Sequence, residues 1–355
     1  MKRVLAILLC LALFLPSAAT VYATEDESTS ATIPGIDTLL PCINALIADR
    51  ESFGIGVEEL ANLYVGFPVQ AYEVRTNGGL QKTDFEIYPV FSDQRMLGEI
   101  IKTDEGTTQF SRMFYEVFSE CEDLAVAVVY DNEHTYLIDR DTGNAQIVYS
   151  YSYRNDRGTL TNAGQLAASE EIQWTEVERW SIVFQANQAV QPAADGVYPV
   201  IVLPTGVVLQ SDTYLCWAAC VACIGNYLTS ISHSAEYVAQ QYPAGYNQPA
   251  QLSTSVGFLS ALYGQSYFNT DKHNAPTDTL IHDNLSAGYP LFGRWTDGGI
   301  DWHQTVIRGI NVSSGWLYVM DPRSGYITAN KTNGVFRYVT SEGDTLTLVG
   351  YAAQQ

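Results

Sequence analysis

Basic residues are scarce in this sequence: its 355 residues contain 18 Lys and Arg against 39 Asp and Glu, a formal net charge of −21. The imbalance is strongest in residues 24–200, with 29 acidic and 10 basic side chains, whereas residues 201–355 contain 10 and 6. An acidic protein repels phosphate backbones, so we expect no nucleic-acid partner. A second explanation of the acidity is that it only keeps the protein soluble.

Long apolar runs are lacking after the first fifteen residues, and no later stretch is apolar enough to cross a bilayer. The chain begins with Lys2 and Arg3, an apolar run over residues 4–15 that Pro16 ends, and a small-residue cleavage site at residues 21–23. This is the pattern of a secretory signal peptide, and the run is too short to span a membrane. We therefore expect a signal peptide over residues 1–23 and a secreted protein, extracellular or associated with the cell surface.

Cysteine is sparse, with six residues, one of which lies inside the expected signal peptide. The odd number that remains leaves at least one thiol free, even where disulfides form. Cys42 and Cys121 form the pair that could bridge in the first half of the chain. Cys216, Cys220 and Cys223 have neither a matching second pair nor a histidine at ligand spacing, so we expect no metal site. Nothing in the sequence requires an organic cofactor.

The length of the chain favours two domains over a single core. Residues 188–196 (Q-A-V-Q-P-A-A-D-G) are small and polar and include proline, which is typical of an exposed connector. We therefore expect an acidic N-terminal region over residues 24–190 and a second domain over residues 191–355. The sequence contains no internal repeat.

Periodicity and turn residues predict an α+β N-terminal region with an antiparallel sheet. The expected helices cover residues 38–48, 57–64 and 109–119, and the expected strands cover 85–91, 96–101, 125–130, 135–139 and 146–153. In the C-terminal half, helices are expected at 215–228, 234–242, 253–262 and 277–287, and strands at 197–203, 289–295, 302–310, 316–321, 335–340 and 345–352. Helices followed by an antiparallel sheet indicate a second α+β domain.

The chemistry of the second domain centres on Cys216, which opens a helix. The positive end of the helix dipole favours a thiolate there, and a thiol nucleophile also needs a base, a group that orients the base and an oxyanion donor. His303 opens a strand and Asp321 ends the next one, so the carboxylate can reach the imidazole across adjacent strands. The structural alternatives are a buried cysteine, a core histidine and a turn-initiating aspartate.

Gln210, five intervening residues, Cys216-Trp217, His303 and Asp321 follow one another in an order that resembles the papain-like cysteine peptidases. The stretches 288–295 (G-Y-P-L-F-G-R-W), 301–310 (D-W-H-Q-T-V-I-R-G-I) and 316–322 (W-L-Y-V-M-D-P) resemble the bacterial branch, which includes staphopains and bacteriocin-leader peptidases. The resemblance covers residues 197–355. Residues 211–215 lack the Gly-rich sequence of plant-type members, which also have Asn where Asp321 stands.

The resemblance implies a papain-like catalytic domain, with N-terminal helices packed on a C-terminal antiparallel sheet. Cys216 would be the nucleophile, His303 the general base, Asp321 its orienting residue and Gln210 the oxyanion donor. The N-terminal region is similar in style to the pro-regions of streptopain-like peptidases, which implies a zymogen with an intramolecular pro-region. A permanent binding domain is the alternative for that region.

The resulting prediction is a secreted bacterial cysteine endopeptidase that acts on polypeptides. One alternative keeps the same residues in a Cys/His amidase or transglutaminase-like enzyme that acts on cell wall or protein. A second alternative is an inactive binding or adhesion protein on a peptidase scaffold.

Overall fold

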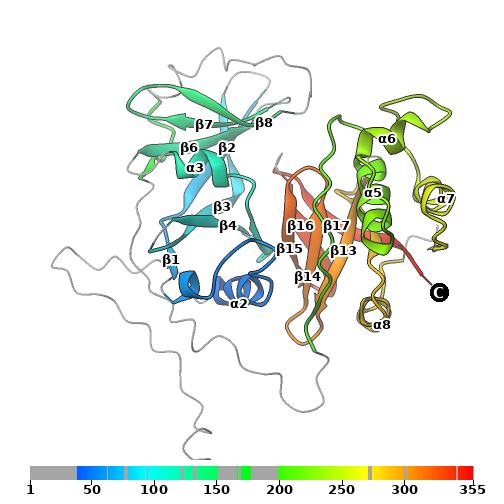
Figure 1. Ribbon diagram of the computed structural model, residues 1–355. Helices are drawn as coiled ribbons and strands as arrows, with labels where there is room; N and C mark the ends of the chain where they lie inside the picture. The colour runs from blue at the N-terminus through cyan, green and yellow to red at the C-terminus, as the bar shows by residue number, and fades with distance from the viewer. Residues whose placement is uncertain are drawn as a thin grey trace, which may run out of the picture.

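A computed structural model of the chain describes residues 38–61, 63–75, 79–93, 95–120, 124–130, 134–150, 166, 169–176, 199–270, 274–299, 302–340 and 343–354. These residues form two sheets with accompanying helices, which confirms the mixed α+β class (Figure 1). The expected signal peptide and the expected boundary between residues 190 and 191 lie outside the described residues. Within the described residues, no helix is both long and apolar enough to cross a membrane.

The first sheet belongs to the N-terminal half and has the strand order β5-β4-β3-β2-β6-β7-β8, with β1 paired to β3 and β9 to β6. Its strands are β1 (Leu63–Val65), β2 (Val69–Val74), β3 (Leu80–Ser92), β4 (Met96–Thr103), β5 (Thr108–Ser111), β6 (Ala125–Tyr130), β7 (His134–Asp139), β8 (Ala145–Ser150) and β9 (Thr175–Glu176).

The purely antiparallel sheet expected for this half is wrong at one position, because β2 and β6 are parallel. Strands β3 to β5 and the helix α3 (Tyr115–Ser119) lie between them in the chain. A connection of that length lets the chain return and run in the same direction, which a tight turn cannot do.

Two helices expected in this half are largely absent. Residues 57–64 contain only a short 3-10 helix, η2 (Glu58–Leu60), before β1 begins. Residues 109–119 begin as strand β5, and only α3 is helical. Phe110 in β5 is fully buried and its backbone pairs with β4, so tertiary pairing outweighs local helix preference there. The first expected helix is present as α2 (Leu40–Ala48), with proline in its opening turn.

The second sheet belongs to the C-terminal half, and the pairings between its described strands are all antiparallel. Its order is β10-β13-β12-β17-β16-β15-β14, and β13 also pairs with β14, so the sheet closes on itself. The strands are β10 (Ile201–Val202), β11 (Phe268–Thr270), β12 (Leu291–Thr296), β13 (His303–Asn311), β14 (Trp316–Asp321), β15 (Gly325–Thr332), β16 (Val335–Val339) and β17 (Thr345–Ala353). Strands β11 and β15 were not expected from the sequence.

Alternation along the strands separates the inner from the outer face of the closed sheet. Leu317 and Val319 of β14 join one buried cluster with residues of β12, β13, β15, β16 and β17, so this cluster fills the interior. Trp316 and Tyr318 point the other way and join a cluster with helix α2 of the N-terminal half. The outer face of β14 is therefore covered by the first half of the chain.

Helix α5 (Cys216–Leu228) packs against another part of the outer face, where its buried residues meet Phe292, Val306 and Met320. The other helices of this half are α6 (Ala235–Gln240), α7 (Leu252–Tyr263) and α8 (Asp278–Ser286). In Figure 1 the sheet of β13 to β17 lies between the N-terminal half on one side and α5, α6 and α7 on the other. The outer face of the closed sheet thus packs against the N-terminal half in one part and against the helices of the C-terminal half in another.

Candidate active site

Cys216 stands at the first position of helix α5 and the residue is partly exposed, whereas the next residues along the helix are buried. No side chain caps this helix; its N-cap is Leu215, whose N–H donates to the carbonyl of Asp212 at 3.2 Å. The turn that starts the helix therefore comes from backbone bonding. The first N–H groups of the helix, including that of Cys216, have no partner within the helix.

His303 and Asp321 lie at the end of the closed sheet where β13 begins and β14 ends. The pairing of Val306 with Met320, extended by one residue, places Asp321 opposite Thr305, two residues from His303. Nε2 of His303 lies 2.9 Å from Oδ1 of Asp321, and the two side chains are 5% and 1% exposed. The structure therefore joins the imidazole and the carboxylate that the sequence singled out.

The electrostatics of His303 favour the charged ring. Burial by itself would lower the pKa of the ring, but the Asp321 carboxylate and the hydrogen bond to it outweigh burial and the nearby Arg323, and the pKa is raised to about 9. The same contact lowers the pKa of Asp321, against the effect of burial. The backbone N–H of Arg323 also donates to Oδ1 of Asp321 at 2.7 Å, which favours the carboxylate.

Cys216 and His303 are close enough that each favours the charged form of the other. Burial alone would raise the pKa of the thiol, but the neighbouring His303 ring with its positive charge and the backbone N–H of Gln304 lower it. Asp321 occupies Nε2, and Nδ1 is buried with no hydrogen-bond partner among the described residues. Nδ1 is therefore the ring nitrogen left to exchange a proton with the thiol.

Gln210 is brought beside the site but does not present a free amide hydrogen. Its backbone N–H donates to the carbonyl of Pro322 at 2.9 Å, directly after Asp321. Its side-chain Nε2 donates to the carbonyls of Asp212 (3.0 Å) and Thr213 (3.2 Å), and its Oε1 is buried without a partner among the described residues. In this conformation the amide holds the turn before the helix.

A residue that sequence reasoning missed, Asn247, anchors the same turn from another part of the chain. Its Nδ2 donates to Oδ1 of Asp212 at 2.7 Å, and its Oδ1 accepts from the backbone N–H of Tyr214 at 3.1 Å. Asn247 has a left-handed backbone with φ of 57°. Asn tolerates that conformation, but the local sequence carries no signal of a contact more than thirty residues away.

Gln304, next to His303, fixes the start of β13 against α7. Its Oε1 accepts from the hydroxyl of Ser255 at 2.7 Å, and its Nε2 donates to the carbonyl of Ala250 at 2.8 Å. Gln304 is buried, so these two bonds hold the strand that carries His303 at a set distance from the helices. The structure therefore gives Gln304 a positioning role.

The other described cysteines differ from Cys216. Cys42, Cys220 and Cys223 are free and fully buried, and Cys121 lies outside the described residues. Burial raises the pKa of Cys223 to about 12 and raises that of Cys220 well above its ordinary value. A thiol in such surroundings stays protonated and unreactive, so Cys216 is distinct within the described residues.

No group of three or more His, Cys, Asp and Glu side chains that could hold a metal ion is present in the described ranges. The chemistry that the arrangement can perform is nucleophilic: a thiol of lowered pKa, a raised-pKa imidazole beside it and a buried carboxylate behind the imidazole.

One comparison with known proteins bears on this domain. Residues 201–340 match the model of a family described as papain-like cysteine protease AvrRpt2. No curated protein matches the chain. The matched range contains Gln210, Cys216, His303 and Asp321, and it supports the papain-like cysteine peptidase superfamily. The resemblance to staphopains and to streptopain-like pro-regions rests on the sequence patterns alone.

Proposed function

We propose that this cysteine-type peptidase, a hydrolase of polypeptides, is a secreted endopeptidase that uses Cys216 as its nucleophile. His303 acts as the general base and acid, Asp321 orients it, and Gln210 contributes to the oxyanion site. One observation carries the proposal. Cys216, a partly exposed residue at a helix N-terminus, has a thiol whose pKa is lowered by a neighbouring buried imidazole. That imidazole lies 2.9 Å from a buried carboxylate, inside the range matched by a peptidase family.

The proposed reaction follows from the charges of these groups. The Cys216 thiolate attacks the scissile carbonyl, and the protonated His303 ring donates its proton to the leaving amine. Water then attacks the thioester while the neutral ring accepts a proton from it, and the second product leaves with a free carboxylate. Asp321 stays ionised throughout, because its role is to hold the ring and to stabilise its positive charge.

The oxyanion of the tetrahedral intermediate needs donors that are already in place. The backbone N–H of Cys216 is one, since it has no partner within the helix. The Gln210 amide is the second, and to serve it has to exchange its bond to Asp212 or Thr213 for the substrate oxygen. The turn of residues 211–214 therefore positions both donors, the Cys216 backbone N–H and the Gln210 amide.

The location and maturation of the enzyme are part of the same proposal. The sequence pattern of residues 1–23 supports secretion, and the likeness to streptopain-like pro-regions supports synthesis as a zymogen. The match to a peptidase family, together with a packing of α5 on the closed sheet, supports a papain-like arrangement. Mass spectrometry of the protein from culture medium tests maturation: a species that starts near residues 188–200 supports it, and only chains that start near residue 24 contradict it.

The catalytic assignment is tested with Cys216→Ala and Cys220→Ala. Cys216→Ala should abolish casein cleavage and labelling by a thiol-directed epoxide, with a circular dichroism spectrum like that of the parent. Cys220→Ala removes a buried thiol one turn along the same helix and should retain labelling at Cys216. Casein cleavage at the parent rate by purified Cys216→Ala protein would refute the assignment.

A further inference from the structure

The N-terminal half is bound to the catalytic half through a buried ion pair. Arg308 of β13 and Asp49, which follows α2, are 0% and 2% exposed in their side chains. Nη1 of Arg308 lies 3.2 Å from Oδ1 of Asp49 and 2.9 Å from the hydroxyl of Ser52, and Nη2 bonds to Oδ2 of Asp49. The guanidinium also stacks 4.0 Å above the ring of Tyr326.

Each member of this pair depends on the other domain. A buried charge is tolerated when it is paired and hydrogen-bonded, and it becomes very unfavourable when its partner is removed. Arg308 would face solvent or lie unpaired if the N-terminal half departed. Asp49, on the N-terminal half, would likewise face solvent or lie without its charged partner.

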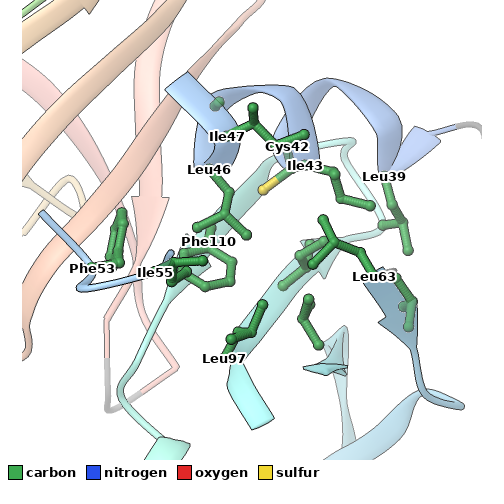
Figure 2. Close-up of a cluster of buried hydrophobic side chains, with 14 of the residues drawn as sticks. Leu39, Cys42, Ile43, Leu46, Ile47, Phe53, Ile55, Leu63, Leu97 and Phe110 are labelled. Atoms are coloured by element: carbon green, nitrogen blue, oxygen red, sulfur yellow. The ribbon is translucent and has the colours of Figure 1, made fainter. Parts of the chain in front are cut away.

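An apolar cluster surrounds the ion pair. Trp316 and Tyr318 on the outer face of β14 are 2% and 0% exposed, and they share a cluster with the buried face of α2 and with Phe53. Figure 2 shows the α2 side of this cluster, where Cys42, Ile43 and Leu46 point toward the strand residues below the helix. Two large aromatic side chains of β14 are therefore buried in a cluster that comes mostly from the N-terminal half, with Val202 and Tyr326 packed against it.

Strand β5 adds a set of buried hydrogen bonds along β15 and β16. Gln109 bonds to both backbone groups of Val339, with its Nε2 2.8 Å from the carbonyl and its Oε1 2.5 Å from the N–H. The N–H of Phe110 donates to the hydroxyl of Thr328 at 2.8 Å. These donors and acceptors are buried, so separation would have to rehydrate them. At the rim, Arg337 and Glu105 form a more exposed pair.

The interface lies directly behind the strands that carry the site. Arg308 is five residues along β13 from His303, and Trp316 and Tyr318 precede Asp321 on β14. The described residues of the N-terminal half contact this back surface and leave Cys216 partly exposed. Such an arrangement fixes the spacing of His303 and Asp321 without covering the thiol.

From these contacts we infer that the N-terminal half is a permanent structural partner of the peptidase domain, which stays bound after the chain is cut within residues 177–198. Processing of the proposed zymogen therefore does not release it. The inference goes beyond the proposed function, because a pro-region that is simply discarded would expose the Arg308 charge and the two aromatic side chains. It does not depend on which residue performs the chemistry.

The experiment uses the full-length chain with a specific protease recognition sequence inserted between residues 190 and 191, in the Cys216→Ala background to prevent self-cleavage. After complete cutting, the two pieces are passed through a gel-filtration column at micromolar concentration. We expect a single peak that contains both pieces. Two separate peaks, with a folded peptidase piece by circular dichroism, would overturn the inference.

Matched variants at the interface identify the contact that keeps the two cut pieces associated. Asp49→Ala leaves Arg308 unpaired and should weaken association of the cut pieces by about 100-fold or more. Asp49→Leu combined with Arg308→Met removes both charges and should restore co-elution, since burial of two apolar side chains replaces the pair. Glu105→Ala breaks only the exposed rim pair and should change association less than about fivefold. Equal effects of Asp49→Ala and Glu105→Ala would contradict the role of the buried pair.

A second readout separates this inference from the proposed chemistry. The same cut protein with Cys216 intact is treated with the thiol-directed epoxide, and the rate of labelling is compared before and after cutting. We expect labelling at Cys216 no slower after cutting than before, together with an unchanged single peak. Loss of labelling with co-elution retained would count against the proposed catalytic role of Cys216, whereas separation of the pieces would count against the permanent partner.

Discussion

In the proposed mechanism, the charge of Asp321 controls the pH range in which the thiolate–imidazolium pair exists. The pair forms as pH rises through the lowered pKa of Cys216 and is lost as pH rises through the pKa of His303, about 9. The two groups are coupled, so the measured limbs belong to the pair. We expect kcat/KM against pH to show an alkaline limb near 9.

The size of the effect follows from the geometry. At an effective dielectric of about 20, unit charges 2.9 Å apart attract by roughly 6 kcal/mol. Burial of the ring and the charge of Arg323 oppose this attraction. A His303 pKa of about 9 in place of 6.5 corresponds to a net free energy of roughly 3 kcal/mol in favour of the protonated ring. Both side chains are buried, so solvent does not screen the interaction appreciably.

Asp321→Asn tests this reasoning because the amide keeps an oxygen for the Nε2–H and loses only the charge. Burial and Arg323 still lower the His303 pKa, so the alkaline limb should move down by about 2 pH units or more. The rate of epoxide labelling against pH gives the same information without a substrate. The control is Asp278→Asn, which removes the same charge from a more exposed pair with Lys331. An alkaline limb that stays near 9 in Asp321→Asn would refute the electrostatic account.

Two further pairs of variants test the positioning of the site and its packing. Asn247→Gly keeps the left-handed backbone and removes both hydrogen bonds to the turn before Cys216. We therefore expect kcat to fall about tenfold with little change in KM. The control is Asn333→Gly, which has a similar φ in a distant turn and should leave kcat and KM unchanged. A fall of equal size in both variants would contradict a positioning role. Gly225→Ala places a methyl group against the Tyr263 ring and should lower the free energy of unfolding by about 1–3 kcal/mol. Gly257→Ala, with open space around it, should raise that free energy by about 0.5–1 kcal/mol, and urea denaturation measures both.

Much of the site could be predicted because its residues stand at the ends of strongly patterned elements. The apolar stripes of residues 215–228 indicate a buried helix, and the structure has α5 at Cys216–Leu228. The strands that carry His303 and Asp321 are separated by a short turn, and antiparallel pairing brings their ends far from that turn, where His303 and Asp321 stand, side by side. Local patterns thus place three side chains at one location.

Other parts of the site depend on contacts between distant segments. Asn247 contacts Asp212 across 35 positions, and the hydrogen bonds of the Gln210 amide to the turn follow from the fold of that turn. Strands β5 and β15, which face each other across the two halves, also lack a clear pattern of their own. Their strand conformation is stabilised by neighbours that a local window does not contain.

The order of Gln210, Cys216, His303 and Asp321 along the chain indicated the kind of chemistry, because the residue types, and the places of the last three at the ends of elements, follow from local sequence. Tertiary structure alone decided that the second sheet closes through β13 and β14, and that Asp49 meets Arg308 across 259 positions. A charge can be buried only where its partner arrives, and the partner arrives only when both halves have folded and packed.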